Sequence, residues 1–482
     1  MVESPLFLFI YSRNNTPCAG APAVTYDTVI TGSRVALPSG AIQRNIVIDE
    51  GRIVRITGEL PACDEVIDGE GLVSLPGIID PHMHYGVYSP IDRAAETESR
   101  VAAAGGVTTM MRMLRLGGSY RESLGEQLEA SAMHHHVDYA IHASIFNEQQ
   151  VKEMEYCARG GAPSFKLYMN LGSEAGHVYM DMPPGIDALV EERVEVGNKL
   201  VREVMKRAAS LGCPVLVHAE DYESCSCGMR EAREDGQDGL RAWSESRPPE
   251  SEVLAISQAS AAAREFDCTV YFVHIGSAAA LSRIRAERAL GTRIFVETCP
   301  HYMTLSNDKD GYLAKVMPPI RTSSDVDAVW AAITAGEIDT IGTDHVANRL
   351  GRKLGDDVWD SLAGFPGAGT LLPLLLSEGV NKNRITLEGL ASLTSASAAR
   401  IFSMNSKGRL EPGADADITM VDLGLERSVS SGLFGGFSDY TVYEGRALKG
   451  WPVRTIVRGE TVSEGLKVTG KPGYGRPAAR HM

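Results

Sequence analysis

The chain has 482 residues, of which 47 are basic and 62 acidic, so its formal net charge is −15. This acidic balance argues against nucleic acid or an anionic membrane as the main partner. With 44 % hydrophobic residues and with Gly and Pro spread along its length, the composition is that of a globular protein and excludes a disordered or collagen-like polymer.

The N-terminal segment, residues 1–23, matches no structural pattern, and we leave it unassigned. Its apolar stretch at residues 6–11 is short and follows Glu3 instead of a basic region, so it makes a poor signal peptide. No window of the chain reaches the roughly 18 uncharged apolar residues of a membrane-spanning helix. The eight cysteines form no Cys-x-x-Cys pair, so we expect reduced thiols in a cytoplasmic protein.

Both ends of the remaining chain have a β-strand pattern. Residues 24–72 contain short β-like runs, such as Thr28–Ile30 and Asn45–Asp49, separated by Gly and Pro turns. The pattern returns in residues 406–468, where Ala414–Leu423 and Val453–Val462 are predicted strands. These two segments predict one small β domain built from both chain ends, followed by a tail at residues 469–482.

Residues 73–405 alternate short apolar runs with longer stretches rich in Ala, Glu, Arg and Leu, which is the pattern of repeated βα units. The runs that we predict as strands are Val73–Asp80, Val107–Leu114, Tyr139–Ile145, Ser164–Met169, Pro214–Glu220, Thr269–Ile275, Arg293–Cys299 and Ile338–Asp344. Eight parallel strands with intervening helices favour a (β/α)8 barrel. An open doubly wound sheet is the alternative, but no strand is followed by a G-x-G-x-x-G turn. The glycine-rich run Gly364–Thr370 contains no Lys, so it is a poor phosphate-binding loop.

Polar residues that can bind metal follow the predicted strands at or near their C-terminal ends. They are His82, His84, Lys166, His218, His274 and Asp344. In a barrel these strand ends meet at one mouth, where active sites of this fold lie. A lone His at a strand end is more often a hydrogen-bonded core residue. So many polar groups together, however, all need buried partners, and a metal site supplies those partners at once.

Lys166 does not fit a simple metal site, because a cation repels an ammonium group. If CO₂ adds to the neutral amine, the side chain ends in a carboxylate whose oxygens can bridge two cations about 3.5–4 Å apart. The alternative is an ion pair between Lys166 and Asp344 in a metal-free mouth, which leaves the four histidines unexplained.

Several motifs in this order resemble the cyclic amidohydrolases, the group of dihydropyrimidinases, hydantoinases and allantoinases. They are the H-x-H of His82 and His84, the "SFK" of Lys166, "HAE", "HIGS", "ETCPHY" (Glu297–Tyr302), "PPIR" (Pro318–Arg321) and "GTDH". The resemblance covers almost the whole chain and is closest in pattern to hydantoinases. The C-terminal "GKPGYGR" (Gly470–Arg476) is similar to the tail of D-hydantoinases.

This resemblance implies the architecture of a (β/α)8 barrel with a small β-sandwich domain formed by the N- and C-terminal segments. It also implies a homo-oligomer, usually a tetramer and in some members a dimer. The cofactors would be two Zn²⁺ ions per subunit, with Mn²⁺ or Co²⁺ as alternatives, and Lys166 would be N6-carboxylated by CO₂.

The resemblance also implies the role of each ligand. The more buried zinc would be held by His82, His84, Lys166 and Asp344, and the second by Lys166, His218 and His274. A hydroxide bridging the metals would hydrolyse a C–N bond of a small cyclic amide, such as a hydantoin or dihydropyrimidine. Asp344 would be the catalytic residue that takes the proton and delivers it to the leaving nitrogen.

The substrate contacts match the family less well. A Tyr donates to the oxyanion five residues after the carboxylated Lys in hydantoinases, but Leu171 stands at that position, and Tyr168 is the nearest substitute. Met317 replaces a usual Ser before "PPIR". The segment around Gly364 and Phe365 is closer to L-hydantoinases or allantoinases than to D-hydantoinases. We expect these five residues to contact substrate.

Other polar residues are expected to have smaller roles. We predict a solvated turn for His134–His136, a place at the mouth without metal ligation for His301 and His345, and a structural ion pair for Arg321.

Two other functions stay open. One is allantoinase-like or imidase activity on a ureide or cyclic imide. The other, from a different class, is a non-catalytic dihydropyrimidinase-like scaffold, and the complete set of competent ligand residues argues against it.

Overall fold

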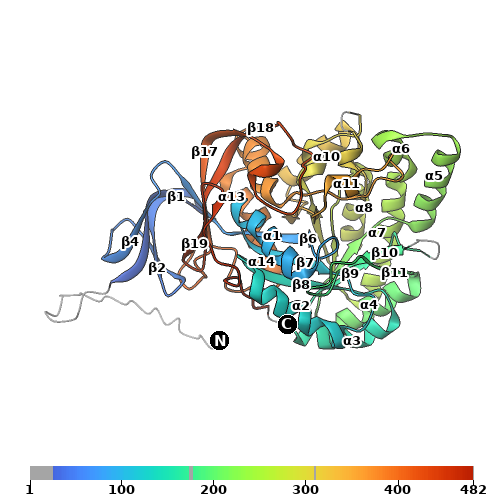
Figure 1. Ribbon diagram of the computed structural model, residues 1–482, viewed down its shortest axis with the longest axis horizontal. Helices are drawn as coiled ribbons and strands as arrows, with labels where there is room; N and C mark the ends of the chain where they lie inside the picture. Colours follow the sequence, from blue (N-terminus) through green and yellow to red (C-terminus); the bar gives the residue numbers. More distant parts are fainter. Residues whose placement is uncertain (1–24, 173–176, 309–310, 481–482) are drawn as a thin grey trace, which may run out of the picture.

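The computed structural model describes residues 25–172, 177–308 and 311–480. The unassigned segment at residues 1–23 and the last two residues of the tail lie outside these ranges. Figure 1 shows an outer β domain beside a larger body in which helices surround a second sheet.

The larger body contains a parallel sheet that closes into the predicted barrel. Its strands, in hydrogen-bonded order, are β15 (Thr340–Ile341), β14 (Ile294–Thr298), β13 (Val270–Phe272), β12 (Val215–His218), β9 (Phe165–Tyr168), β8 (Asp138–Ser144), β7 (Val107–Leu114), β6 (Ile78–His84) and β16 (His345–Val346). The first and last of these belong to one chain segment: β15 pairs with β14, and β16 pairs with β6. Residues 340–346 therefore close the barrel, and the (β/α)8 prediction is confirmed.

A helix follows each of the first seven barrel strands. These helices are α1 (Ile91–Ala104), α2 (Tyr120–His134), α3 (Glu148–Arg159), α4 (Asn198–Ser210), α7 (Pro249–Phe266), α8 (Ala278–Ala289) and α10 (Ser323–Thr334). Several start at a residue that caps the free backbone N–H groups of the first turn. Ser119, Asn147 and Ser277 are such caps, for α2, α3 and α8.

Shorter helices occupy the connections. They are α5 (Tyr222–Glu234), α6 (Gly239–Ser246), α9 (Pro300–Thr304), α11 (Leu350–Lys353), α12 (Leu371–Leu374), α13 (Leu387–Ala391) and α14 (Ser397–Ile401). One end of the barrel interior is filled by apolar side chains, among them Ile79, Met111 and Leu216, which pack against Phe402 just after α14. Because this end is solid, a site can form only at the other end, where the strands terminate.

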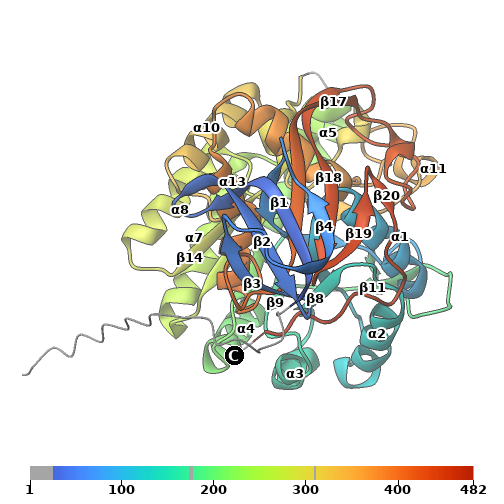
Figure 2. The same ribbon diagram turned by 90° about the vertical axis from the view of Figure 1, so that its left-hand side faces the viewer.

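The outer domain is one sheet to which both ends of the chain contribute. In order, its strands are β20 (Lys467–Val468), β19 (Glu460–Glu464), β18 (Ala447–Val457), β17 (Ile418–Ser428), β5 (Val73–Pro76), β1 (Tyr26–Leu37), β2 (Gly40–Asp49) and β3 (Arg52–Thr57), with β4 (Cys63–Asp68) paired to β1. Figure 2 shows the blue N-terminal and red C-terminal strands side by side. Ile46, Ile48, Ile418 and Ile456 share its buried core.

The predicted first barrel strand, Val73–Asp80, is divided between the two sheets. Its first part is β5, which pairs with β1 and β17, and the barrel strand β6 begins only at Ile78. The chain changes sheet at Gly77, where an added Cβ would lie 2.2 Å from Oγ1 of Thr108. Only glycine allows this close approach, which a run of apolar residues does not reveal.

The C-terminal tail returns to the barrel. The backbone N–H of Tyr139 donates to the carbonyl of Arg476, and the N–H of Ala478 donates to the carbonyl of Tyr139. Across the three described ranges, no helix combines the length and apolarity needed to cross a membrane. The seven cysteines in those ranges are free thiols.

Candidate metal centre and active site

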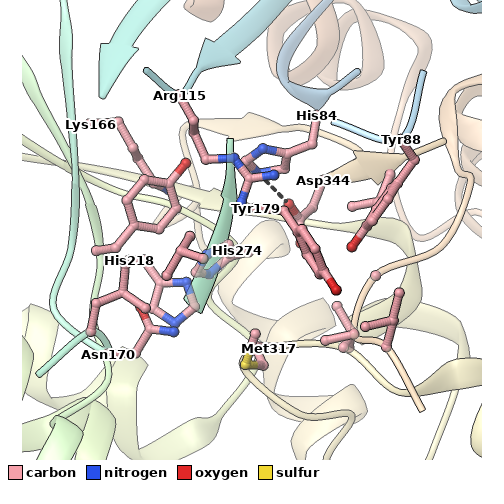
Figure 3. A pocket seen from close by; sticks show the side chains of 18 of the residues that line it. His84, Tyr88, Arg115, Lys166, Asn170, Tyr179, His218, His274, Met317 and Asp344 are labelled. Carbon is pink, nitrogen blue, oxygen red and sulfur yellow. Dashed lines mark ion pairs between the residues drawn. The ribbon is translucent and has the colours of Figure 1, made fainter. Parts of the chain in front are cut away.

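Three of the predicted ligands converge on one point at the barrel mouth. Oδ1 of Asp344 lies 3.2 Å from Nε2 of His82 and 3.2 Å from Nε2 of His84, and the two nitrogens are 3.3 Å apart. All three residues are buried, and their ligand atoms could hold one metal ion. Figure 3 shows Asp344 and His84 meeting at the wall of the cavity.

The backbone is strained at two of the predicted ligand positions. Asp344 has φ 50° and His274 has φ 44°, in the left-handed region that residues with a side chain rarely adopt. Asp80 supports the first of these turns, because its carboxylate accepts from the backbone N–H of Thr343 at 3.0 Å and from its hydroxyl at 2.6 Å. Strain held in place at several points of one cavity is typical of functional sites.

The protonation of His82 is set by a buried acid. Its Nδ1 lies 2.6 Å from Oε1 of Glu297, which also receives the backbone N–H of His274. The proton is therefore best placed on Nδ1, and the lone pair of Nε2 faces Asp344. Burial holds the pKa values of His82 and His84 well below the usual range, so both imidazoles are neutral, as metal ligands must be.

A second pair of histidines lies beside the first. The rings of His218 and His274 are 4.6 Å apart, and His274 is 5.4 Å from His82. Nε2 of His218 lies 2.7 Å from Glu220, whose carboxylate also accepts two hydrogen bonds from Arg247. Burial alone would raise the pKa of Glu220, but Arg247 and His218 keep it well below its usual range. This carboxylate leaves Nδ1 of His218 as the free ligand atom.

Lys166 is fully buried among these groups, and its Nζ has no hydrogen-bond partner within the described residues. The centre of the Tyr168 ring lies 5.1 Å from Nζ. Burial lowers the pKa of Lys166 to about 7, so much of the amine is neutral near neutral pH. A buried amine without a partner fits the chemistry of a group that is completed by CO₂ and metal.

These residues open onto a cavity of about 320 Å³. Of the predicted substrate contacts, Tyr168, Leu171, Met317 and Gly364 line the cavity. Phe365 does not: its ring packs 5.2 Å from that of His301, behind the wall. Apolar side chains make up much of the remaining wall, namely Phe146, Val178, Val316, Val346, Leu362 and Ala363.

Sequence reasoning missed four polar residues that line the cavity, namely Tyr88, Arg115, Asn170 and Tyr179. Arg115 directly follows β7, so its position at a strand end was a signal that could have found it. Tyr179 lies on β10 (His177–Met180), which pairs with β11 (Val190–Arg193). No local pattern reveals that this hairpin faces the barrel mouth.

Comparison with known proteins agrees with this geometry. The model of the amidohydrolase family matches residues 73–462. The chain belongs to the amidohydrolase family. An allantoinase of Solibacter usitatus is 31 % identical over 457 residues, covering 93 % of this chain and 96 % of that protein. A D-phenylhydantoinase of Escherichia coli O1:K1 is 30 % identical over 471 residues, covering 93 % and 97 %.

A solved structure of an L-hydantoinase (dihydropyrimidinase) from Arthrobacter aurescens superposes on this amidohydrolase with a TM-score of 0.85. Its sequence identity is 26 %, and the match covers 94 % of this chain and 99 % of that one. Together these relatives place the amidohydrolase in the cyclic amidohydrolase group that the motifs indicated.

The remaining predictions for this amidohydrolase have mixed outcomes. Arg321 forms the expected structural ion pair, 2.6 Å from Glu252. His345 is fully buried, and its Nε2 lies 2.8 Å from Glu98. Its Nδ1 accepts from the backbone N–H groups of Gly367 and Ala368, so it supports the loop at residues 364–370 and does not line the cavity. His301 is likewise buried outside the cavity lining.

The predicted solvated turn at residues 134–136 is wrong for two of its three histidines. His135 and His136 are buried. Nε2 of His135 lies 3.2 Å from the hydroxyl of Tyr85, and Nδ1 of His136 lies 3.0 Å from the carbonyl of Gly470. The C-terminal tail covers this turn, and such a contact between distant segments leaves no local signal.

Proposed function

We propose that the protein opens the ring of a small cyclic amide, such as a hydantoin or dihydropyrimidine, by metal-dependent hydrolysis. The convergence of His82, His84 and Asp344 at the end of a partly apolar cavity carries this proposal. Hydantoinase and allantoinase relatives that match along nearly the whole chain support the same reaction class.

The buried groups fit a pair of divalent cations, with zinc as our proposal and manganese or cobalt as alternatives. His82, His84, Lys166 and Asp344 would hold one cation, and Lys166, His218 and His274 the other. Such a pair supplies a hydroxide nucleophile near neutral pH and polarises the scissile carbonyl. Lys166 is suited to its part because its neutral amine can add to CO₂ and lose a proton, which gives a carbamate.

Asp344 is the residue that we assign to proton transfer. Its carboxylate lies at the cavity wall among neutral imidazoles, where a proton received during attack can be passed to the leaving ring nitrogen. The cavity walls exclude water from the rest of the ring and hold it against this carboxylate. Leu171 offers no hydroxyl, so Tyr168 is our candidate donor to the developing oxyanion.

A second candidate is allantoinase-like or imidase ring opening. The Solibacter allantoinase is at least as similar to this chain as the hydantoinase from Escherichia coli, and both matches are near full length. The scaffold alternative is less well supported, because burial lowers the pKa values of all four candidate histidine ligands and so favours the neutral imidazoles that bind metal.

The test is a mass-spectrometric assay with metal-loaded protein and a panel of hydantoins, dihydrouracil, allantoin, dihydroorotate and succinimide. We expect at least one product heavier by one water, loss of this product after treatment with a chelator, and its return when zinc and bicarbonate are added. Protein that binds two metals per chain and opens no ring in a broad panel would contradict the proposal. Protein that binds no metal would favour the scaffold.

A further inference from the structure

Arg115 is a cavity residue that the proposed chemistry does not use. It directly follows β7 and lines the same cavity as His84 and Lys166 (Figure 3). Its Nε is buried and has no hydrogen-bond partner within the described residues. A buried N–H without a partner is unfavourable, so its presence in a cavity indicates a group that a ligand completes.

The charge of Arg115 is not neutralised by the protein around it. Asp181 accepts only a weak hydrogen bond, from the backbone N–H of Arg115 at 3.4 Å. Asp181 is shared with the fully buried Arg112, whose Nε lies 3.8 Å from its carboxylate. Within the described residues no ion pair joins the guanidinium of Arg115 to an acid, so its positive charge is left facing the cavity.

Arg115 shares the cavity with the candidate metal centre. His84, Lys166 and Asp344 line the same cavity as Arg115. A small ring bound against these candidate ligands would therefore occupy the cavity that the guanidinium also lines.

A second polar atom of the cavity lacks a partner. Oδ1 of Asn170 is buried and unpaired within the described residues, and Asn170 also lines the cavity. A carbonyl oxygen accepts hydrogen bonds, so it complements an N–H of a cyclic amide. Arg115 can only donate, and a planar guanidinium fits a carboxylate with two parallel hydrogen bonds.

We propose that Arg115 is a specificity-determining residue that binds a carboxylate on the substrate. The substrate class is then a cyclic amide or ureide that carries an acidic substituent, with a ring N–H facing Asn170. This inference rests on the proposed ring-opening function. It narrows the expected substrates from neutral cyclic amides to those that carry a negative charge.

The test compares two substrates that differ in charge and little in shape, hydantoin-5-acetate and hydantoin-5-acetamide. Wild-type protein is expected to have a higher kcat/KM for the acid, mainly through KM. In Arg115→Gln, kcat/KM for the acid should fall about 10- to 100-fold, since a hydrogen bond to a charged group contributes about 1.5–3 kcal/mol. Its loss of kcat/KM for the amide should be clearly smaller, because the amide carries no charge for the guanidinium to bind.

Two further variants complete the design. Arg115→Lys keeps the charge and should retain part of the preference for the acid. Arg349→Gln removes an exposed arginine, whose side chain is 53 % accessible and lies 3.8 Å from Asp439. This control should leave kcat/KM unchanged for both substrates. If Arg115→Gln does not fold, the wild-type preference for the acid and its decrease with added salt still test the proposal.

Three results would overturn the inference. They are equal kcat/KM for acid and amide in wild type, equal losses for both substrates in Arg115→Gln, and loss of bound metal in that variant, which would make Arg115 a positioning residue for Lys166. If wild type opens no ring, the proposed function fails. The inference is then decided by whether hydantoin-5-acetate raises the melting temperature of wild type more than that of Arg115→Gln.

Discussion

The candidate ligands are fixed by acids that do not face the cavity themselves. Glu297 holds Nδ1 of His82, and Glu220, anchored by Arg247, holds Nε2 of His218. Each carboxylate selects one tautomer and so directs a lone pair toward the site. The candidate donor atoms of these two histidines are therefore oriented by the protein itself.

Asp344→Asn is the most informative substitution at the site. The amide keeps an oxygen that can bind metal but cannot carry a proton, so we expect partial metal content and a kcat lower by about 10²- to 10⁴-fold. Elemental analysis and steady-state kinetics measure both quantities. Asp360→Asn, an exposed carboxylate with 65 % accessibility, is the matched control. Near-normal turnover of metal-loaded Asp344→Asn protein would refute the assignment.

Carboxylation of Lys166 predicts a pH dependence of reconstitution. Only the neutral amine adds to CO₂, and burial lowers the pKa of Lys166 to about 7, so reactivation of metal-free protein should speed up as the pH rises through 7 and level off above it. The pKa values of His82 and His84 lie well below this range and add no second step there. The rate is measured with zinc at a fixed concentration of dissolved CO₂. A rate that rises only near pH 10 would contradict the prediction.

At the scale of elements, the barrel and the outer sheet are joined by a buried group of charges. Nζ of Lys407 lies 2.7 Å from Asp138 at the start of β8 and 2.6 Å from Asp417 just before β17. Arg458, just after β18, also pairs with Asp138. The lysine balances acids from both sheets, so it ties their relative position.

Lys407→Met should therefore destabilise the protein strongly. The substitution leaves two buried carboxylates with Arg458 as their remaining cation, and breaking a buried pair costs about 3–5 kcal/mol. Urea unfolding of the metal-loaded protein measures the change in the free energy of unfolding. Lys449→Met removes a half-exposed lysine 3.4 Å from Glu426 and should cost less than about 1 kcal/mol. Equal losses in the two variants would show that Lys407 does not link the sheets.

At the scale of the whole molecule, the two ends of the barrel differ in structure: one is open and the other is closed. The mouth carries the cavity, while the opposite end is closed by α14, Phe402 and the C-terminal tail. The guanidinium of Arg480 donates to the carbonyls of Phe402 and Ile141 and to the hydroxyl of Ser164. These hydrogen bonds are partly buried, and burial lowers the pKa of Arg480 to about 9.

Arg480→Met should separate stability from catalysis. We expect a loss of about 2–3 kcal/mol, because hydrogen bonds from a charged group to buried acceptors are removed. Metal content and KM of the folded protein should stay unchanged, since the tail lies away from the mouth. Thermal melting measures the loss of stability, and kinetics at 25 °C measure KM. A change in KM as large as the change in stability would mean that the two ends are coupled.

The sequence by itself determined the barrel and the residues at its mouth. Apolar runs separated by helical stretches have a local period, and a polar residue such as His82 or Asp344 at the end of such a run is visible without any knowledge of contacts. Its place relative to the other strand ends then follows from the topology of parallel strands.

Only the tertiary structure decided which groups share the cavity and which support it. The pairing of β5 with the outer sheet, the hairpin that brings Tyr179 to the mouth and the burial of His135 by the tail all depend on contacts between distant segments. The same holds for Arg115, whose missing partner can be recognised only when its neighbours are known. Such contacts are long-range packing outcomes, and neither propensity nor periodicity encodes them locally.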